Sequence, residues 1–397
     1  MRKRTPVLSI GAILLVFVVT PPALAQAPTS DSEPPTSHAH SNWQSHRDKN
    51  ILEWTPQEQR SGYPNIRSIN PTREIPASDQ PRILTEDLWA ETPDWETRMD
   101  ELHLAGLLVI EDGKIRYEKY RQGHSASDRW MSFSIAKSVV SLLYGIAVKE
   151  GHIESLDETV AMYLPQFIGT AYGDVAIRDL LQMASGVQWN EDYEDPNSDV
   201  AALDNASEEE VLQHLTSLPR LYPAGTVFNY NTGETILAGA ILAKAVGMSL
   251  SEYLQTRLWA PFGMSANADW ALMGEDGAEM GGCCISATLR DYGRIGLFAL
   301  REGALDANDR ALPADWMAES TQPSPSAAYY GYFWWLGTDG DYRASGIFGQ
   351  GIHISPEHDL VVAMHGLWPQ AVDQEFSAKR AQLIESIKRV SSQSASN

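Results

Sequence analysis

Segments that favour β-strands lie near both ends of this chain, and segments that favour helices lie between them. Residues 104–110 and 115–120 are apolar-rich runs on either side of a Gly-containing turn, which predicts a β-hairpin. Short β-rich segments punctuated by glycine return at 329–336, 342–348, 351–355 and 360–367. Because such strands must pair to bury their apolar faces, the two ends of the chain are predicted to build one antiparallel sheet.

Helical periodicity fills the rest of the pattern. Apolar residues recur at helical spacing from about Ser134 to Glu150, where Gly151 is placed to end the helix, and again from about Gln374 to Val390. The middle of the chain carries five shorter helical patterns, at 177–183, 208–215, 235–246, 250–258 and 289–301.

The predicted fold class is therefore α+β, an α/β sandwich in which an antiparallel sheet is flanked by the first and last helices. We assign residues 49–152 and 301–397 to this α/β domain and residues 153–300 to an inserted, mainly helical domain. Within the first segment, residues 50–97 show little periodicity, so we expect loops and short turns there.

The first 48 residues are set apart by their composition. Residues 1–25 combine a basic start, an apolar run and an A-x-A-type site that ends at Ala25, which predicts a signal peptide. An uncleaved N-terminal anchor is the alternative. Residues 26–48 are rich in Pro, Ser, Thr and Gln, which predicts a disordered linker. We therefore expect an exported protein, periplasmic or secreted, without stable membrane insertion after cleavage.

Composition excludes several classes of function. A formal net charge of −22 leaves no basic face with which to bind nucleic acid.

The two cysteines, Cys283 and Cys284, are adjacent. Adjacent cysteines rarely meet disulfide geometry, a core of this size does not require a disulfide, and the pair is poor evidence for a metal site. We expect no metal and no cofactor, and the oligomeric state stays open.

Ser134 and Lys137 fit the pattern S-x-x-K. Their three-residue spacing on a helix places both side chains on one face. A lysine acts as a base only when it is neutral, and burial or a neighbouring cation promotes that form by lowering its pKa. A serine in the first helical turn also lies near the positive end of the helix. Alone, the pattern equally fits a helix cap followed by a surface lysine.

Two further segments carry groups that could complete such a site. Tyr230 lies where a loop meets an apolar helix, and its hydroxyl could take the serine proton and later pass it to a leaving group. Simple packing of a loop tyrosine is the alternative. The segment from Ala344 to Gly351 is rich in glycine, which allows a backbone N–H to approach an oxyanion, although an ordinary strand and turn has the same composition.

These segments belong to a longer series of landmarks between about residues 100 and 390. The landmarks are SFSIAKS (132–138), GHIESLDETVAMYLP (151–165), IRDLLQMASGVQWNEDY (177–193), FNYNTGET (228–235), LWAPFGM (258–264), GGCCISATLRDYGRIG (281–296), YGYFWWL (330–336) and SGIFGQGIHISPEHDLVV (345–362). In this order they resemble the β-lactamase-related serine hydrolases, the superfamily of class C β-lactamases, esterases and penicillin-binding peptidases. The likeness is greatest to the 6-aminohexanoate-dimer hydrolase branch.

The resemblance implies a role for each matching residue. Ser134 would be the nucleophile, Lys137 its base and Tyr230 the second acid/base. The backbone N–H groups of Ser134 and Ile347 would form the oxyanion hole. Tyr193 is similar to a tyrosine that contacts the substrate amide. The other candidates for substrate binding are Thr232, Ser345, Gly346 and Trp335.

The sequence departs from the family pattern at two positions. Ala344 stands where the family often has a lysine or histidine, so the cation that holds a β-lactam carboxylate is missing. We therefore expect weak or no β-lactamase activity. Thr232 stands where the usual Tyr-x-Asn motif has its asparagine, and it keeps a hydroxyl but loses the amide.

The leading hypothesis is hydrolysis of a small-molecule carboxylic ester or linear amide through an acyl-enzyme on Ser134. A D-aminopeptidase or a penicillin-binding-type peptidase is the runner-up, and a catalytically dead binding module is a further alternative. We interpret Asp192, Glu194 and Asp195 as a solvated acidic loop, although paired carboxylates also serve glycosidases.

Overall fold

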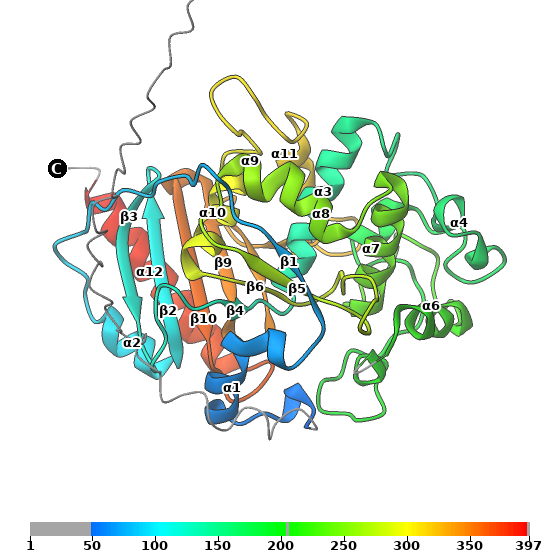
Figure 1. Cartoon of the computed structure of the whole chain (residues 1–397), viewed down its shortest axis with the longest axis horizontal. Coiled ribbons are helices and arrows are strands. Elements are labelled where there is room, and N and C mark those ends of the chain that lie inside the picture. Colours follow the sequence, from blue (N-terminus) through cyan, green and yellow to red (C-terminus); the bar gives the residue numbers. More distant parts are fainter. Residues whose placement is uncertain (1–48, 204–205, 395–397) are drawn as a thin grey trace, which may run out of the picture. The chain divides into compact units, whose positions relative to one another are not determined.

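The computed structural model describes residues 49–203 and 206–394, so the predicted signal peptide and linker lie outside the described residues. Within the described part, the larger sheet has six antiparallel strands in the spatial order β3–β2–β10–β9–β8–β7 (Figure 1). In that order the strands span Lys114–Tyr120, Leu104–Glu111, Leu360–Gly366, Gly351–Ser355, Tyr342–Ser345 and Trp335–Leu336. The hairpin β2–β3 therefore pairs, through β10, with strands from the other end of the chain, as the sequence predicts.

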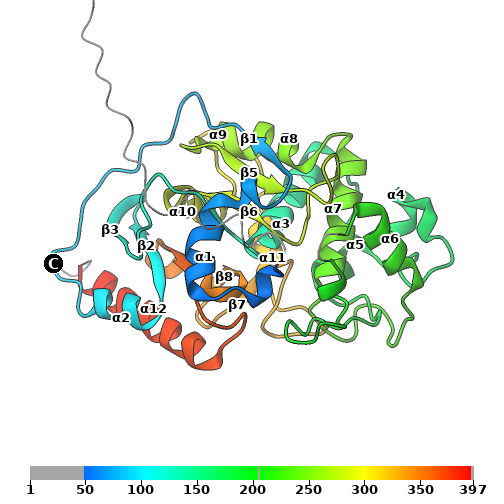
Figure 2. The ribbon, with the colours of Figure 1, turned by 60° about the horizontal axis from the view of Figure 1, so that its bottom comes forward.

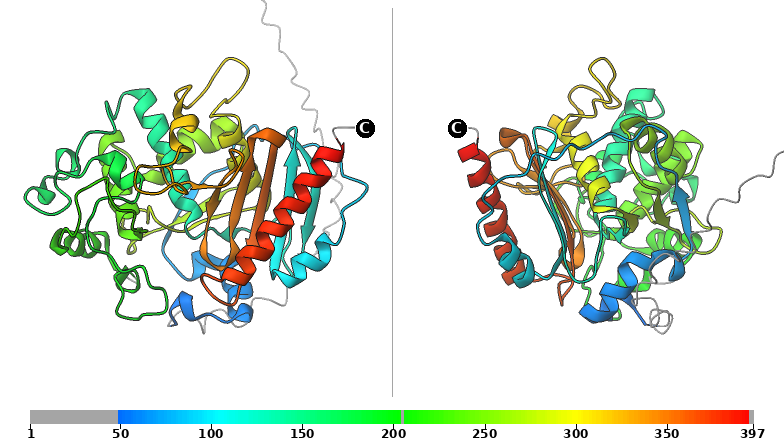
Figure 3. Two further views of the ribbon diagram at one scale, coloured as in Figure 1. Left: turned by 180° about the vertical axis from the view of Figure 1, so that it is seen from behind. Right: turned by 60° about the vertical axis from the view of Figure 1, so that its left-hand side comes forward.

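Helices cover both faces of this sheet. Helices α3 and α10 pack on one face, and α2 and α12 pack on the other (Figure 3). These helices span Ile135–Glu150, Leu289–Leu300, Trp95–Glu101 and Gln374–Ser394. Strand β2 is buried along its whole length, because Leu108 and Ile110 face the first pair of helices while Leu107 and Val109 face the second. Burial on both faces explains why β2 reads as an apolar run rather than as an alternating pattern.

The helical region packs around the long helix α7, which contacts α3, α4, α5, α6 and α8. The helices α4 to α9 and α11 span Val160–Tyr163, Ile177–Leu181, Glu208–Ser217, Thr232–Val246, Leu250–Leu254, Ala260–Phe262 and Trp316–Ser320. Among the described residues, no single helix is long and apolar enough to cross a membrane. Helix α7 and the helical stretch Leu250–Phe262 meet the length and composition test only when taken together, and they are bent by 70° relative to each other. Most of α7 is buried in the protein core. The boundaries of the inserted domain stay a prediction.

A second, smaller sheet was not predicted from the sequence. Its order is β1–β5–β6–β4, and its strands span Thr72–Ile75, Ala268–Ala271, Ile285–Ala287 and Trp130–Met131. Strands of two to four residues are too short for a hydrophobic period to appear. The expectation of loops over residues 50–97 is wrong in part, because α1 (Pro56–Gly62), β1 and the start of α2 lie there. The 3₁₀ turn Tyr63–Ser68 after α1 packs against β4, β5 and β6 (Figure 2).

The predicted strand over residues 329–336 is also wrong for most of its length. Only its last two residues, Trp335 and Leu336, pair with β8. Before them the chain turns: Gly331 N–H donates to the carbonyl of Trp334 at 2.9 Å, and Phe333 has a φ of 59°. Aromatic residues raise β propensity, but here the turn decides the local structure.

Buried leucine and isoleucine side chains of α12 pack against the face of the larger sheet that α2 also covers. Leu383 is completely buried between α12 and the sheet. We predict that Leu383→Ala lowers the free energy of unfolding by about 2–5 kcal/mol, because it leaves a cavity. Urea denaturation would measure the change. Gln382→Ala, at an exposed position of the same helix, is the matched control. A loss below about 1 kcal/mol would show that this face is not a packed core.

Candidate active site

Ser134 stands at the junction between β4 and α3. Ser132 fixes this junction to β6, since its backbone N–H donates to Ile285 O at 2.8 Å and its Oγ accepts from Ile285 N–H at 2.9 Å. Phe133 then adopts the left-handed region, with φ of 48°, which is uncommon outside glycine. The turn leaves Ser134 partly exposed at the N-terminal end of an otherwise buried helix.

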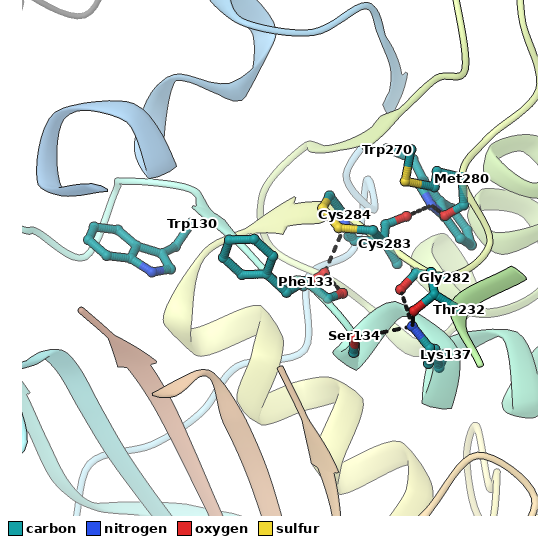
Figure 4. Close-up of a disulfide and its surroundings, with 12 residues drawn as sticks. Trp130, Phe133, Ser134, Lys137, Thr232, Trp270, Met280, Gly282, Cys283 and Cys284 are labelled. Atoms are coloured by element: carbon teal, nitrogen blue, oxygen red, sulfur yellow. Dashed lines mark hydrogen bonds between the residues drawn. A yellow bond between two sulfur atoms is a disulfide. The ribbon is translucent and has the colours of Figure 1, made fainter. Parts of the chain in front are cut away.

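Lys137 is buried, with 1% of its surface exposed. Its ammonium group donates to Ser134 Oγ at 3.1 Å, to Thr232 Oγ1 at 3.1 Å and to the carbonyl of Gly282 at 2.8 Å (Figure 4). Three acceptors match the three protons of a charged lysine. Burial nevertheless lowers the pKa of Lys137 to about 8, while the negative charge of Glu191 acts in the opposite direction. A sizeable fraction of this lysine is therefore neutral near pH 8, as a base must be.

Tyr230 also contacts Ser134. Its hydroxyl is hydrogen-bonded to the Ser134 side chain, and its ring centroid lies 5.3 Å from Lys137 Nζ. The Trp335 ring stacks on Tyr230 at 5.5 Å, whereas the neighbouring Trp334 is fully buried. Burial, with a smaller contribution from the charge of Glu191, holds the pKa of Tyr230 well above its ordinary value. The phenol is therefore protonated at neutral pH. The structure thus brings Ser134, Lys137 and Tyr230 together.

The loop after β8 lies against the start of α3. A Cβ at Gly346 would come within 2.3 Å of the Ser132 carbonyl, so only glycine allows this approach. Ile347 follows and lines the same cavity as Ser134. Ser345 ends β8 and is not among the residues that line the cavity, so its predicted contact with substrate gains no support.

The buried side chain of Gln350 fastens this loop, and sequence reasoning gave it no role. It donates to the carbonyls of Phe348 and Gly366 at 3.2 and 2.9 Å, and it accepts from Trp130 Nε1 at 3.1 Å and Gly366 N–H at 2.8 Å. These bonds tie the loop that carries Ile347 to the end of β10. A glutamine so enclosed is a positioning group, since it does not face the cavity.

Glu191 is the principal residue that sequence reasoning missed. Its carboxylate accepts the Thr232 N–H at 2.9 Å, the Thr232 hydroxyl, the Tyr193 hydroxyl at 2.8 Å and Trp189 Nε1. Because the Thr232 hydroxyl donates to Glu191, its lone pairs face the ammonium of Lys137. The two-residue spacing of Trp189, Glu191 and Tyr193 was a usable signal, since in extended chain it places three side chains on one face.

Two other acidic residues of this loop, Asp192 and Asp195, accept hydrogen bonds from the loop's own backbone, and Glu194 is exposed. Asp192 accepts the N–H of Glu194 at 2.9 Å, and Asp195 accepts the N–H of Asn197 at 2.9 Å. Such contacts are typical of turns in which Asp caps its own loop. Among the described residues, no group of three or more His, Cys, Asp or Glu could hold a metal ion.

A cavity of about 650 Å³ opens beside Ser134. Of the predicted site residues, Ser134, Tyr193, Thr232 and Ile347 line it. Much of the remaining wall is apolar, and it includes Ile66, Ile69, Met131, Leu272, Met273 and Met280. The segment before β1 thus forms one wall, which its irregular sequence did not reveal.

The cysteines differ from expectation, because the structure joins Cys283 and Cys284 in a disulfide. Both residues line the cavity, next to the Gly282 carbonyl that accepts from Lys137 (Figure 4). Hydrogen bonds hold this turn, since Trp270 Nε1 donates to the Cys283 carbonyl at 2.9 Å and Ala271 N–H donates to the Cys284 carbonyl at 3.1 Å. The pair therefore belongs to the cavity wall.

Comparisons with known proteins agree with this geometry. The family model described as Beta-lactamase matches residues 94–384. The 6-aminohexanoate-dimer hydrolase of Paenarthrobacter ureafaciens is 24% identical over 360 residues, which cover 83% of this chain and 91% of that protein. A solved structure from Bacillus anthracis, assigned as a 6-aminohexanoate-dimer hydrolase, has a TM-score of 0.75 at 22% identity and covers 90% of this chain and 98% of its own.

A penicillin-binding protein from Bacillus halodurans has the same fold, with a TM-score of 0.58 at 17% identity over 74% of this chain and 99% of its own. At such identities the solved structures establish the fold, and the family model establishes the family. The predicted resemblance and the predicted fold class are both confirmed. The chain belongs to the beta-lactamase family of hydrolases, and its α+β architecture is the β-lactamase/transpeptidase-like fold.

Proposed function

We propose that this protein is a serine hydrolase that cleaves carboxylic esters or linear amides through an acyl-enzyme on Ser134. The observation that carries the proposal is the buried Lys137, whose pKa is lowered to about 8 and whose Nζ lies 3.1 Å from Ser134 Oγ. A surface lysine after a helix cap, the alternative interpretation of S-x-x-K, would be neither buried nor bonded to the serine. A partly exposed hydroxyl beside a poised base faces a cavity large enough for a small molecule.

In the first half of the reaction, neutral Lys137 takes the proton of Ser134 as Oγ attacks the carbonyl carbon. The carbonyl oxygen becomes an oxyanion that the backbone N–H groups of Ser134 and Ile347 stabilise. When the tetrahedral intermediate collapses, Tyr230 donates its proton to the leaving alcohol or amine. The protonated Lys137 then returns a proton to Tyr230, which leaves an acyl ester on Ser134 and both side chains in their starting forms.

In the second half, water replaces the leaving group. One proton of the water passes to Lys137 as the water oxygen attacks the acyl carbon. Lys137 then returns a proton through Tyr230 to Ser134 Oγ, which leaves as the free hydroxyl. Glu191 takes no proton in this scheme. It holds Thr232 so that the threonine hydroxyl accepts from Lys137, and its negative charge opposes the effect of burial on the lysine.

The substrate is expected to be uncharged near the scissile bond. Among the described residues that line the cavity, the cationic one is Lys49, and it pairs with Glu58 at 3.0 Å. Ala344 supplies no charge where the related enzymes often carry a cation. A substrate carboxylate would therefore lose hydration without gaining a partner. The cost of burying an unpaired carboxylate likewise disfavours β-lactams and D-peptides that end in a carboxylate. Export, suggested by residues 1–25, is part of the proposal.

Removing the nucleophile tests the proposal. We predict that Ser134→Ala lowers kcat/KM for p-nitrophenyl butyrate by about 10³-fold or more. Ser141→Ala, in the same helix, removes a buried hydroxyl that has no hydrogen-bond partner in the described structure and should leave the rate unchanged. Retention of ester turnover by the Ser134 variant would refute the assignment.

The pH profile tests the link between Glu191 and Lys137. The Glu191 charge raises the lysine pKa, so Glu191→Gln should lower it and produce neutral lysine at lower pH. The acid limb of kcat/KM should therefore move to lower pH, whereas Glu194→Gln, an exposed change in the same loop, should not move it. If the acid limb of kcat/KM stays at the same pH in both variants, Glu191 does not act on Lys137.

A charge series tests the substrate class. p-Nitrophenyl hexanoate should be cleaved at least about tenfold more efficiently than an ester of equal chain length that ends in a carboxylate, since an unpaired charge costs more than about 1.4 kcal/mol to bury. Linear amides, D-alanyl peptides and nitrocefin complete the series. Preferred turnover of the carboxylate-terminated peptide would instead support the peptidase alternative.

A further inference from the structure

A second cavity, of about 260 Å³, lies between the larger sheet and α12. Its walls come from β8, β9, β10 and the first half of α12, which crosses the back of the sheet in Figure 3. It shares no lining residue with the cavity beside Ser134. Two arginines line it, Arg343 from β8 and Arg380 from α12.

Neither guanidinium group has a hydrogen-bond or ion-pair partner among residues 49–203 and 206–394, and Arg343 Nε is buried without one. Each group instead lies over an indole ring, Arg343 at 5.8 Å from the centroid of Trp335 and Arg380 at 5.0 Å from that of Trp368. Burial lowers the pKa of Arg380 to about 10, and the neighbouring charge of Arg343 contributes in the same direction. Burial also lowers the pKa of Arg343, but the guanidinium group of arginine starts from so high a pKa that both groups remain charged at neutral pH.

Asp341 and Glu385 also line this cavity, and both pair with Lys388 rather than with an arginine, although Asp341 Oδ1 has no hydrogen-bond partner in the described structure. Asp341 accepts from Lys388 at 3.0 Å and from His353 at 3.1 Å, and Glu385 lies 3.6 Å from the same Lys388. The chain has 52 acidic and 30 basic residues, so an arginine without an acidic partner runs against its composition. Two like charges drawn partly out of water are costly unless a counter-charge joins them.

We propose that this cavity binds a small oxyanion of the phosphate type, held between Arg343 and Arg380. The planar guanidinium fork matches the oxygen atoms of a phosphate, and two forks match its two negative charges. Gly351 keeps the floor open, because a Cβ there would lie 3.9 Å from Arg380 Nη1. Ser377 adds a hydroxyl to the lining. The volume suits free phosphate or a small phosphate monoester.

The test measures binding by titration calorimetry with the full chain, using inorganic phosphate and glycerol phosphate, with chloride and acetate at equal ionic strength as reference salts. Saturable binding of phosphate or of the monoester, stronger than that of acetate, is expected. Whichever of these two ligands binds more tightly shows whether the cavity takes free phosphate or a phosphate monoester. Arg380→Gln should weaken binding by about tenfold or more, because a charge-assisted hydrogen bond is lost. Arg389→Gln, at an exposed position of the same helix, should bind as the unchanged protein does.

A second variant keeps the test decisive if Arg380→Gln does not fold. Gly351→Ala adds one methyl group whose nearest neighbours lie at 3.9 Å, so it should fold and still narrow the cavity. Weaker phosphate binding by this variant supports the site. Arg343 is left unchanged because it packs over Trp335, which stacks on Tyr230. The proposal is overturned if phosphate and the monoester show no saturable binding, or if the folded variants bind them as tightly as the unchanged protein.

Discussion

The ammonium group of Lys137 is removed from water and held by three oxygen atoms, and the candidate site is arranged around it. Lowering a lysine pKa from 10.5 to about 8 corresponds to about 3 kcal/mol that disfavours the charged form in the folded protein. Without acceptors from Ser134, Thr232 and Gly282, the penalty would be larger. Both protonation states of Lys137 are therefore populated near pH 8.

Three distant parts of the chain must meet to supply those acceptors. The small sheet fixes the turn before Ser134, through the bonds between Ser132 and Ile285. The start of α7 brings Thr232, and the turn before β6 brings the carbonyl of Gly282. Glu191 then orients Thr232 from a fourth segment. Apart from the local bond between Lys137 and Ser134, each of these contacts spans a long sequence separation, so the site forms only when both the small sheet and the helical region have folded.

The parts that sequence reasoning predicted are those with a local pattern. The hairpin β2–β3, helix α3 with its end at Gly151, and helix α12 each show their own periodicity or turn signal. The spacing of Ser134 and Lys137 is likewise local, and Tyr230 stood out at a loop–helix junction, although only the family resemblance gave it a catalytic role. Gln350 and the Gly282 carbonyl carry no such pattern, because their roles arise from bonds to residues far along the chain. The alternate spacing of Trp189, Glu191 and Tyr193 marks one face of the chain but does not identify Thr232 as the partner of Glu191. The short strands of the small sheet escaped notice since two to four residues cannot show a period.

We propose that Lys137 in its neutral form activates Ser134. The most direct measurement is the rate of covalent labelling of Ser134 by a fluorophosphonate as a function of pH, with the modified peptide located by mass spectrometry. We expect one adduct, on Ser134, and a labelling rate that rises through about pH 8 to a plateau. The Lys137→Met variant should be labelled slowly, at a rate that does not rise with pH in this way. A rate independent of pH in the unchanged protein, or an adduct on another residue, would show that neutral Lys137 does not activate Ser134.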